Sequence, residues 1–235
     1  MIATIQQDQT YHLFADVRTF LGIDNAANTL SGFAFLVAGA LGLFLLWRER
    51  AAGGSGRFAA QEEMRPYWIL FCAAALTAFG SAYYHLAPND ARLVWDRLPM
   101  SLGFMALLSA TITDRVSVKA GLRLLVPLLL AGAGSVIYWR WSALRGAENL
   151  LPYVVVQYGS IAVVLAIVIL FRSRYTHGTY IFGVLALYAA AKAAEALDAQ
   201  IYALGAIVSG HTLKHLLAAL AVCLLLRMLQ LRRLL

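Results

Sequence analysis

The sequence predicts an all-α integral membrane protein, a bundle of seven transmembrane helices with its N-terminus outside and its C-terminus in the cytoplasm. The first observation is composition, because 61% of the 235 residues are hydrophobic and only 13% are charged, which is far more apolar than an average soluble domain. The second is that apolar runs long enough to cross a hydrocarbon core of roughly 30 Å as helices recur along the chain. The third is the net charge of +7, which is dispersed between these runs as in membrane proteins rather than gathered on one face for nucleic acid.

The runs follow a polar segment, residues 1–28, so we expect no cleavable signal peptide and one transmembrane domain over residues 29–235. Each run begins or ends where basic or other polar residues interrupt the apolar pattern, and the connections between runs are short. In chain order, we expect the seven helices at residues 29–47, 67–86, 92–113, 120–139, 151–171, 179–204 and 209–228.

Basic residues are divided unevenly between the two sides of this predicted bundle. With the N-terminus outside, the outer segments and adjoining helix ends hold five, namely Arg18, Arg92, Arg97, Arg140 and Arg145. The inner segments hold twelve, namely Arg48, Arg50, Arg57, Arg65, Arg115, Lys119, Arg123, Arg172, Arg174, Arg227, Arg232 and Arg233. Because basic flanks are retained on the cytoplasmic side, this division favours the stated orientation.

Five polar residues fall at one depth near the outer surface. Ser81 and His85 lie close to the outer end of the second helix, and Asp96 lies about four residues, or roughly 6 Å, below the start of the third. His211 and His215 lie within about 9 Å of the outer end of the seventh. Ionisable side chains inside a membrane are costly and mark functional sites by default. We therefore expect these five residues to converge if the three helices are neighbours.

The spacings within each helix support this convergence, because residues four apart share a face. His211 and His215 form an HxxxH pair that presents two imidazoles to one metal ion, and His85 would supply a third. Three imidazoles and a water form the open tetrahedral arrangement of catalytic zinc, which lowers the pKa of the bound water to about 7. Asp96 would then act as general base, and Ser81 would hydrogen-bond the water or the developing oxyanion.

The same residues resemble the motifs of the alkaline ceramidase family of seven-helix membrane hydrolases, within the wider CREST superfamily that includes adiponectin-receptor-like proteins. The likeness extends over nearly the whole chain in helix count and orientation. It implies zinc held by His85, His211 and His215, with Ser81 and Asp96 contacting the zinc-bound water. It also implies hydrolysis of the amide of ceramide to a sphingoid base and a fatty acid. The implied partner is a membrane lipid, with no nucleic acid and no protein partner.

In the N-terminal segment, alkaline ceramidases carry several acidic residues that resemble a calcium site, ending in a carboxylate three residues before an N-T-x-S motif. Here NTLS begins at Asn28, so that position is Asn25, with Asp24 beside it and Asp16 upstream. A hard cation needs several oxygen ligands, and this segment offers fewer carboxylates. The sequence therefore does not favour calcium as a second ion.

Two rival functions remain open. A receptor or lipid sensor of the adiponectin-receptor-like type could keep the same metal site with little turnover. A bis-His haem or redox protein could also use an HxxxH helix, although it explains Asp96 and Ser81 less well.

The remaining polar residues are expected to have structural roles. Lys192, Glu195 and Asp198 share one face of the sixth helix and are expected to pair with one another or with Lys214, with binding of a substrate headgroup as the alternative role. His12 is expected to be an ordinary solvated or interfacial residue. The excess of Arg over Lys hints at a GC-rich bacterial genome, and hence at an inner membrane with the site near the periplasmic side.

Overall fold

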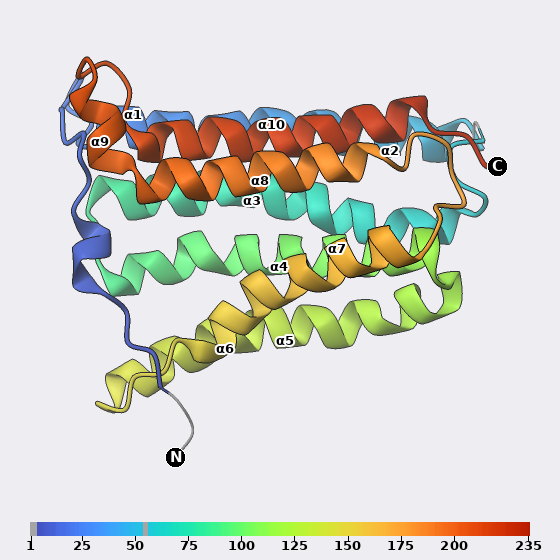
Figure 1. The fold of residues 1–235 in the computed structure, drawn as a ribbon, viewed down its shortest axis with the longest axis horizontal. Coiled ribbons are helices and arrows are strands. Elements are labelled where there is room, and N and C mark those ends of the chain that lie inside the picture. The colour runs from blue at the N-terminus through green and yellow to red at the C-terminus, as the bar shows by residue number, and fades with distance from the viewer. Residues whose placement is uncertain (1–3, 54–55) are drawn as a thin grey trace.

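The computed structural model describes residues 4–53 and 56–235, which form a bundle of helices aligned along the long axis of the molecule (Figure 1). The long helices are α2 (Phe33–Ala51), α3 (Arg65–Leu86), α4 (Asp90–Arg115), α5 (Val118–Leu144), α7 (Ser160–Leu170), α8 (Tyr180–Ala196) and α10 (Gly210–Leu231). Shorter helical turns are η1 (Gln9–His12), α1 (Ala26–Ser31), η2 (Gln61–Met64), α6 (Leu151–Val154), the π-helical η3 (Val155–Gly159) and α9 (Asp198–Ala203).

Each of the seven predicted apolar runs is helical, with two differences in detail. The first run begins earlier than expected, at Ala26, and is interrupted at Gly32 between α1 and α2. The prediction of a single helix over residues 179–204 is wrong, because α8 ends at Ala196 and α9 starts at Asp198. The Asp198 carboxylate accepts hydrogen bonds from the backbone N–H groups of Ala15 and His211, at 2.9 and 2.7 Å. These tertiary bonds hold the chain at the break.

Five helices of the described residues are long and apolar enough to cross a membrane, at Ala26–Ala51, Gln61–Leu86, Val118–Leu144, Leu151–Leu170 and Gly210–Leu231. Their outer faces expose large apolar side chains such as Val126, Leu130 and Ile169, as expected of a surface in contact with lipid. The protein is therefore a membrane protein. Helices α4 and α8 lie in the same bundle but are not among these five, because α4 is more polar and α8 has only 17 residues. The number of spans, seven, and the orientation stay predictions.

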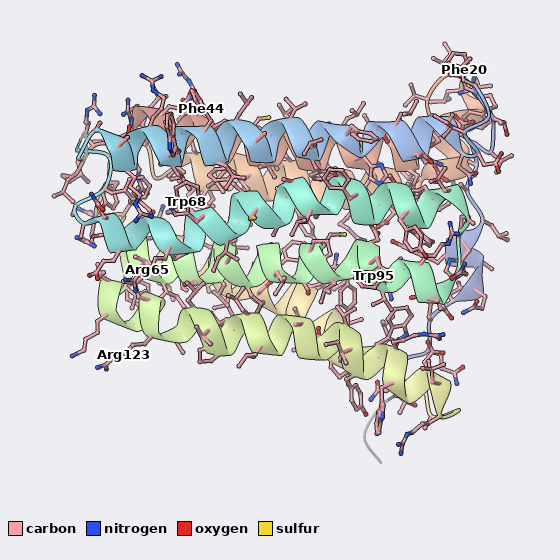
Figure 2. The ribbon with its side chains drawn as sticks, turned by 180° about the vertical axis from the view of Figure 1, so that it is seen from behind. Phe20, Phe44, Arg65, Trp68, Trp95 and Arg123 are labelled. Atoms are coloured by element: carbon pink, nitrogen blue, oxygen red, sulfur yellow. The ribbon has the colours of Figure 1, made fainter. Side chains whose placement is uncertain are left out.

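The two ends of the bundle differ in their basic residues, and the N-terminal segment covers only one of them. Residues 4–25 run across one end, past the ends of α3 and α4 (Figure 1); we call this the N-segment end. Figure 2 shows Arg65 and Arg123 at the opposite end from Phe20, which belongs to the N-terminal segment. This agrees with the sequence, in which Arg65 and Arg123 belong to the basic segments predicted on the opposite side of the membrane from the N-terminal segment.

Helices α3 and α4 approach each other closely at Gly80, near the N-segment end. A Cβ atom at this position would overlap the carbonyl oxygen of Trp95 and lie 2.7 Å from its carbonyl carbon. Only glycine leaves room for this contact. Ser81 and Asp96 follow directly on the two helices and line the same cavity.

Arg232, just beyond α10, fastens the C-terminal residues to the opposite end of the bundle. Its side chain is 1% exposed and forms an ion pair of 2.8 Å with Asp114 of α4. The guanidinium also lies over the rings of Phe58 and Tyr175, at 4.1 and 4.2 Å from their centroids. Arginine suits such a place because its planar cation can stack on aromatic rings and hydrogen-bond at its edge.

We expect Arg232→Met to lower the free energy of unfolding by about 3 kcal/mol, because it leaves the Asp114 carboxylate buried without its cation. Unfolding of the detergent-solubilised protein, followed by helix content, measures the loss. The matched control is Arg227→Met, since Arg227 is exposed and should change stability by less than about 0.5 kcal/mol. Replacing Asp114 by Asn in the Arg232→Met background should restore part of the stability, and an unchanged single variant would contradict this role.

Candidate metal centre

Three buried imidazoles meet at the N-segment end of the bundle. His85 is the penultimate residue of α3, while His211 and His215 lie in the first two turns of α10. They are 0%, 4% and 4% exposed, and their candidate ligand atoms all lie within 4.8 Å of one another. The predicted convergence is confirmed, and the group can hold a metal ion. No other group of three or more His, Cys, Asp or Glu side chains of this kind occurs in the described ranges, 4–53 and 56–235.

The distances within this group suit a small tetrahedral ion. The Nε2 atoms of His85 and His211 are 3.3 Å apart. Two nitrogens bound to zinc at about 2.0–2.1 Å in tetrahedral geometry would be roughly 3.3–3.4 Å apart. The ring centroids of the three pairs are 4.8, 5.0 and 4.9 Å apart, so the rings surround one point rather than stack.

A neighbouring hydroxyl orients the ring of one of the three histidines. The Ser31 hydroxyl lies 2.8 Å from Nδ1 of His215 and donates a hydrogen bond to the carbonyl oxygen of Asn28. It can therefore accept from Nδ1–H of His215, which leaves Nε2 of that ring free as a ligand. The side-chain amide of Asn25 donates to the carbonyl oxygen of His85 at 2.8 Å. Nδ1 of His85 is buried and has no hydrogen-bond partner among the described residues.

The N-terminal segment covers the centre from outside the bundle. The Phe14 ring lies 4.7 Å from the centroid of His85 and 4.6 Å from that of His211. This covering excludes water from one side of these two rings. The sequence did not indicate it, because a single Phe in a polar segment has no periodic signal.

Ser81 and Asp96 line a cavity of about 290 Å³ that also reaches His215. Ser81 and Asp96 are 1% and 6% exposed, and the Ser81 hydroxyl has no hydrogen-bond partner within the described part of the chain. A buried hydroxyl without a partner is unfavourable, so Oγ is available to a ligand. All five predicted residues therefore lie close together, although His215 is the only one of the three histidines that lines this cavity.

A second cavity, of about 150 Å³, adjoins the first deeper in the bundle. The two share the lining residues Phe35, Thr77, Met100, Tyr188 and Ala218. Beyond these, the deeper cavity is lined almost entirely by apolar side chains from α3, α4, α7, α8 and α10, among them Leu70, Leu107, Ile161, Val184 and Leu225. The site is thus polar near the N-segment end and apolar toward the centre of the bundle.

Glu195 of α8 pairs with two lysines at the polar cavity. Its carboxylate forms ion pairs with Lys192 on the same helix and with Lys214 on α10. Burial raises the pKa of Tyr11 well above its ordinary value, so its phenol stays protonated and donates to Glu195 at 3.0 Å. The predicted network is confirmed for these charged residues but is wrong for Asp198, which instead caps the first turn of α10 through the N–H of His211.

The carboxylates of the N-terminal segment are engaged in other bonds. Asp16 forms a two-point ion pair with Arg18, and the hydrogen bonds from Arg18 hold the pKa of the Asp16 carboxyl below its ordinary value. Asp24 accepts from the Thr19 hydroxyl at 2.9 Å, and the Asn25 amide bonds His85 instead of an ion. These side chains do not converge into a cluster of oxygen ligands.

His12 differs from the expectation of a solvated side chain. Its Nδ1 lies 2.8 Å from the Tyr84 hydroxyl and its Nε2 lies 3.1 Å from Asp90. These contacts fasten the N-terminal segment to α3 and α4 beside the metal centre. Long-range partners of this kind have no signature in the sequence.

A scan against protein-family models gave no match, and a search of curated proteins gave none either. The chemistry of the site is therefore the basis on which a function can be assigned.

Proposed function

We propose that this protein is a zinc-dependent hydrolase that cleaves the amide bond of a membrane lipid, most simply ceramide, to give a sphingoid base and a fatty acid. The observation that carries the proposal is the grouping of three buried imidazoles beside Asp96, Ser81 and a cavity that becomes apolar with depth. Neither a purely structural histidine cluster nor a simple lipid pocket needs all of these parts together.

The donor set fits zinc better than a hard cation. Neutral imidazoles are common ligands of zinc, whereas calcium and magnesium prefer oxygen. His85, His211 and His215 would hold the ion through one nitrogen each, leaving a fourth position open. When bound, zinc supplies a Lewis acid that polarises a carbonyl and lowers the pKa of water.

The cavity suits a lipid lying along the bundle. Its polar part contains the candidate catalytic residues, so a scissile carbonyl would lie near Ser81 and Asp96. The acyl chain would extend into the deeper cavity, which is lined by residues such as Leu107 and Leu225. In the orientation predicted from the basic residues, this places the reaction near the non-cytoplasmic surface, which in a bacterium is the periplasmic side of the inner membrane.

In the proposed reaction the Asp96 carboxylate accepts a proton from the attacking water, whose oxygen forms a bond with the carbonyl carbon of the amide. The Ser81 hydroxyl, which lines the same cavity as Asp96, donates a hydrogen bond to the carbonyl oxygen as negative charge develops on it. Asp96 then gives the proton to the leaving nitrogen as the C–N bond breaks. Phe14 excludes bulk water from the far side of the imidazoles.

The two rival functions account for less of the site. In a bis-His haem protein the porphyrin plane must fit between two imidazoles, whereas here each pair of rings is in direct edge contact. A receptor or sensor needs the metal and the cavity but gives no role to an acid–base residue such as Asp96.

Elemental analysis of the purified protein, combined with mass spectrometry of a lipid extract incubated with it, tests the proposal. We expect about one zinc per chain and a metal-dependent release of fatty acid and amine from an amide lipid. Loss of zinc to a chelator should stop the release, and zinc should restore it. Protein that binds zinc but releases no fatty acid from the extract would favour the receptor.

A further inference from the structure

Arg97 is a buried cation at the polar cavity, next to Asp96 on α4. It is 6% exposed and lines the cavity. Its guanidinium lies over the rings of Trp139, Tyr153 and Tyr11, at 4.5, 4.8 and 5.5 Å from their centroids. In the sequence, Arg97 is distinguished only as one of the basic side chains on the outer side of the predicted bundle.

One terminal nitrogen of the Arg97 guanidinium has no hydrogen-bond partner in the described ranges. The other donates to the side-chain oxygen of Gln7 at 2.5 Å, while the unpartnered nitrogen is buried. Arg97 takes part in none of the ion pairs formed within the described part of the chain. A buried charge is stable only when it is paired and hydrogen-bonded. The three aromatic faces hold the cation in place but do not satisfy its N–H groups.

The charges around the cavity leave this cation available to a ligand. Glu195 already forms ion pairs with the ammonium groups of Lys192 and Lys214. Asp8 lies at the exposed mouth, where its carboxylate caps the turn at Thr10. Asp96 is required for proton transfer in the proposed reaction. No carboxylate in the described ranges forms a direct ion pair with Arg97, so its unpartnered nitrogen can bind an anionic ligand.

We propose that Arg97 binds an anionic oxygen group, phosphate or carboxylate, on the headgroup of the lipid that occupies this cavity. The proposal rests on the proposed function for the reaction itself. It changes the expected substrate from ceramide, whose headgroup is a neutral hydroxyl, to amide lipids with an anionic headgroup. Arginine binds such groups through two parallel N–H···O bonds, and its unpaired nitrogen supplies a donor for them.

The geometry along α4 orders the parts of this substrate. Arg97 faces the N-terminal segment through Gln7 and Tyr11, where a headgroup would enter. Asp96 is adjacent, at the level of the amide. Leu107 of the apolar cavity lies ten residues further along the helix, or roughly 15 Å away. An anionic headgroup, an amide and an acyl chain can thus occupy one continuous space.

Binding of non-hydrolysable probes tests the anion site without any turnover. Isothermal titration of the full-length protein in detergent micelles, with empty micelles as blank, compares octyl phosphate, 1-octanol and inorganic phosphate. We expect octyl phosphate to bind at least about tenfold more tightly than the other two, as one or two charge-assisted hydrogen bonds require. Equal binding of octanol would overturn the proposal, and equal binding of inorganic phosphate would assign the site to a free anion instead of a headgroup.

Variants locate the effect at Arg97. Arg97→Gln should bind octyl phosphate and octanol within about twofold of each other, and Arg97→Lys should keep part of the preference because it keeps the charge. The control is Arg92→Gln, since Arg92 also stacks on a ring, that of Tyr83, but is only half-buried and does not line the cavity. An unchanged preference in Arg97→Gln would contradict the assignment, and the wild-type comparison decides the question if that variant does not fold.

Hydrolysis of two matched amides separates this inference from the proposed function. N-octanoylglycine carries a carboxylate and N-octanoylethanolamine a neutral hydroxyl on similar chains. We expect wild type to favour the anionic amide in kcat/KM and Arg97→Gln to lose that preference. Turnover of both amides without preference would refute the anion site and leave the hydrolase standing. Tight binding of octyl phosphate with no turnover of either amide would support the anion site and refute the hydrolase.

Discussion

His211→Ala and His215→Ala should each lower the affinity of the protein for zinc by more than about 100-fold. Loss of an outer partner of a metal-bound histidine already costs 10–100-fold, and these variants would remove a ligand itself. Zinc per chain after dialysis against a weak chelator, measured by elemental analysis, should fall from about one to near zero. Lipid turnover should fall with it.

One control variant and one variant with a smaller expected loss separate metal loss from damage to the fold. His177→Asn changes an exposed histidine with a positive φ of 60°, which asparagine tolerates, so zinc content should stay at one per chain. Ser31→Ala removes only the hydroxyl beside Nδ1 of His215 and should lower zinc affinity by about tenfold. Zinc retained at full affinity in His211→Ala, with unchanged helix content, would exclude a three-histidine centre.

Asp96→Asn should keep its zinc but lose about 10²- to 10⁴-fold in kcat, since general acid–base catalysis contributes that much. The amide has nearly the size of the carboxylate, so packing in the cavity is preserved, but it cannot accept a proton from water. Single-turnover measurements on a short-chain amide, with zinc content determined on the same sample, would measure the loss.

The matched control is Asp90→Asn, because Asp90 begins the same helix and contacts His12 rather than the cavity. Its kcat should stay within a few-fold of wild type. If Asp96→Asn turned over lipid at the wild-type rate, another group would have to be the base and the assignment of Asp96 would be wrong.

Much of the fold follows from the sequence because a membrane imposes strong local rules. Backbone polar groups in hydrocarbon must bond within the helix, so each apolar run became a helix within a few residues of its expected bounds. The exceptions are at Gly32 and Leu197, and at Leu197 the tertiary bonds of Asp198 decide the path. Asp198 illustrates the limit, since its spacing from Glu195 matched one helix face while its actual partners are backbone groups of two other segments.

The histidines of the site were also predictable, because HxxxH spacing fixes two rings on one face and membrane depth fixes the level of the third. Spacing within a helix is a local property, whereas the choice of neighbours around the site is not. Ser31 was visible only as part of an N-T-x-S motif, and nothing in its position along the chain indicated a contact with His215. Phe14 and Arg97 were missed for the same reason.

The sequence by itself determined that this chain forms membrane helices and that His85, His211 and His215 lie at a common level near one end of them. Only the tertiary structure decided that the N-terminal segment covers that end, that Gly80 lets α3 and α4 approach closely, and that Arg97 forms no direct ion pair within the described residues. The physical reason is that helix formation and depth depend on residues within a few turns of each other. Burial, ion pairing and cavity shape instead depend on segments far apart in the chain, which only the packed bundle brings together.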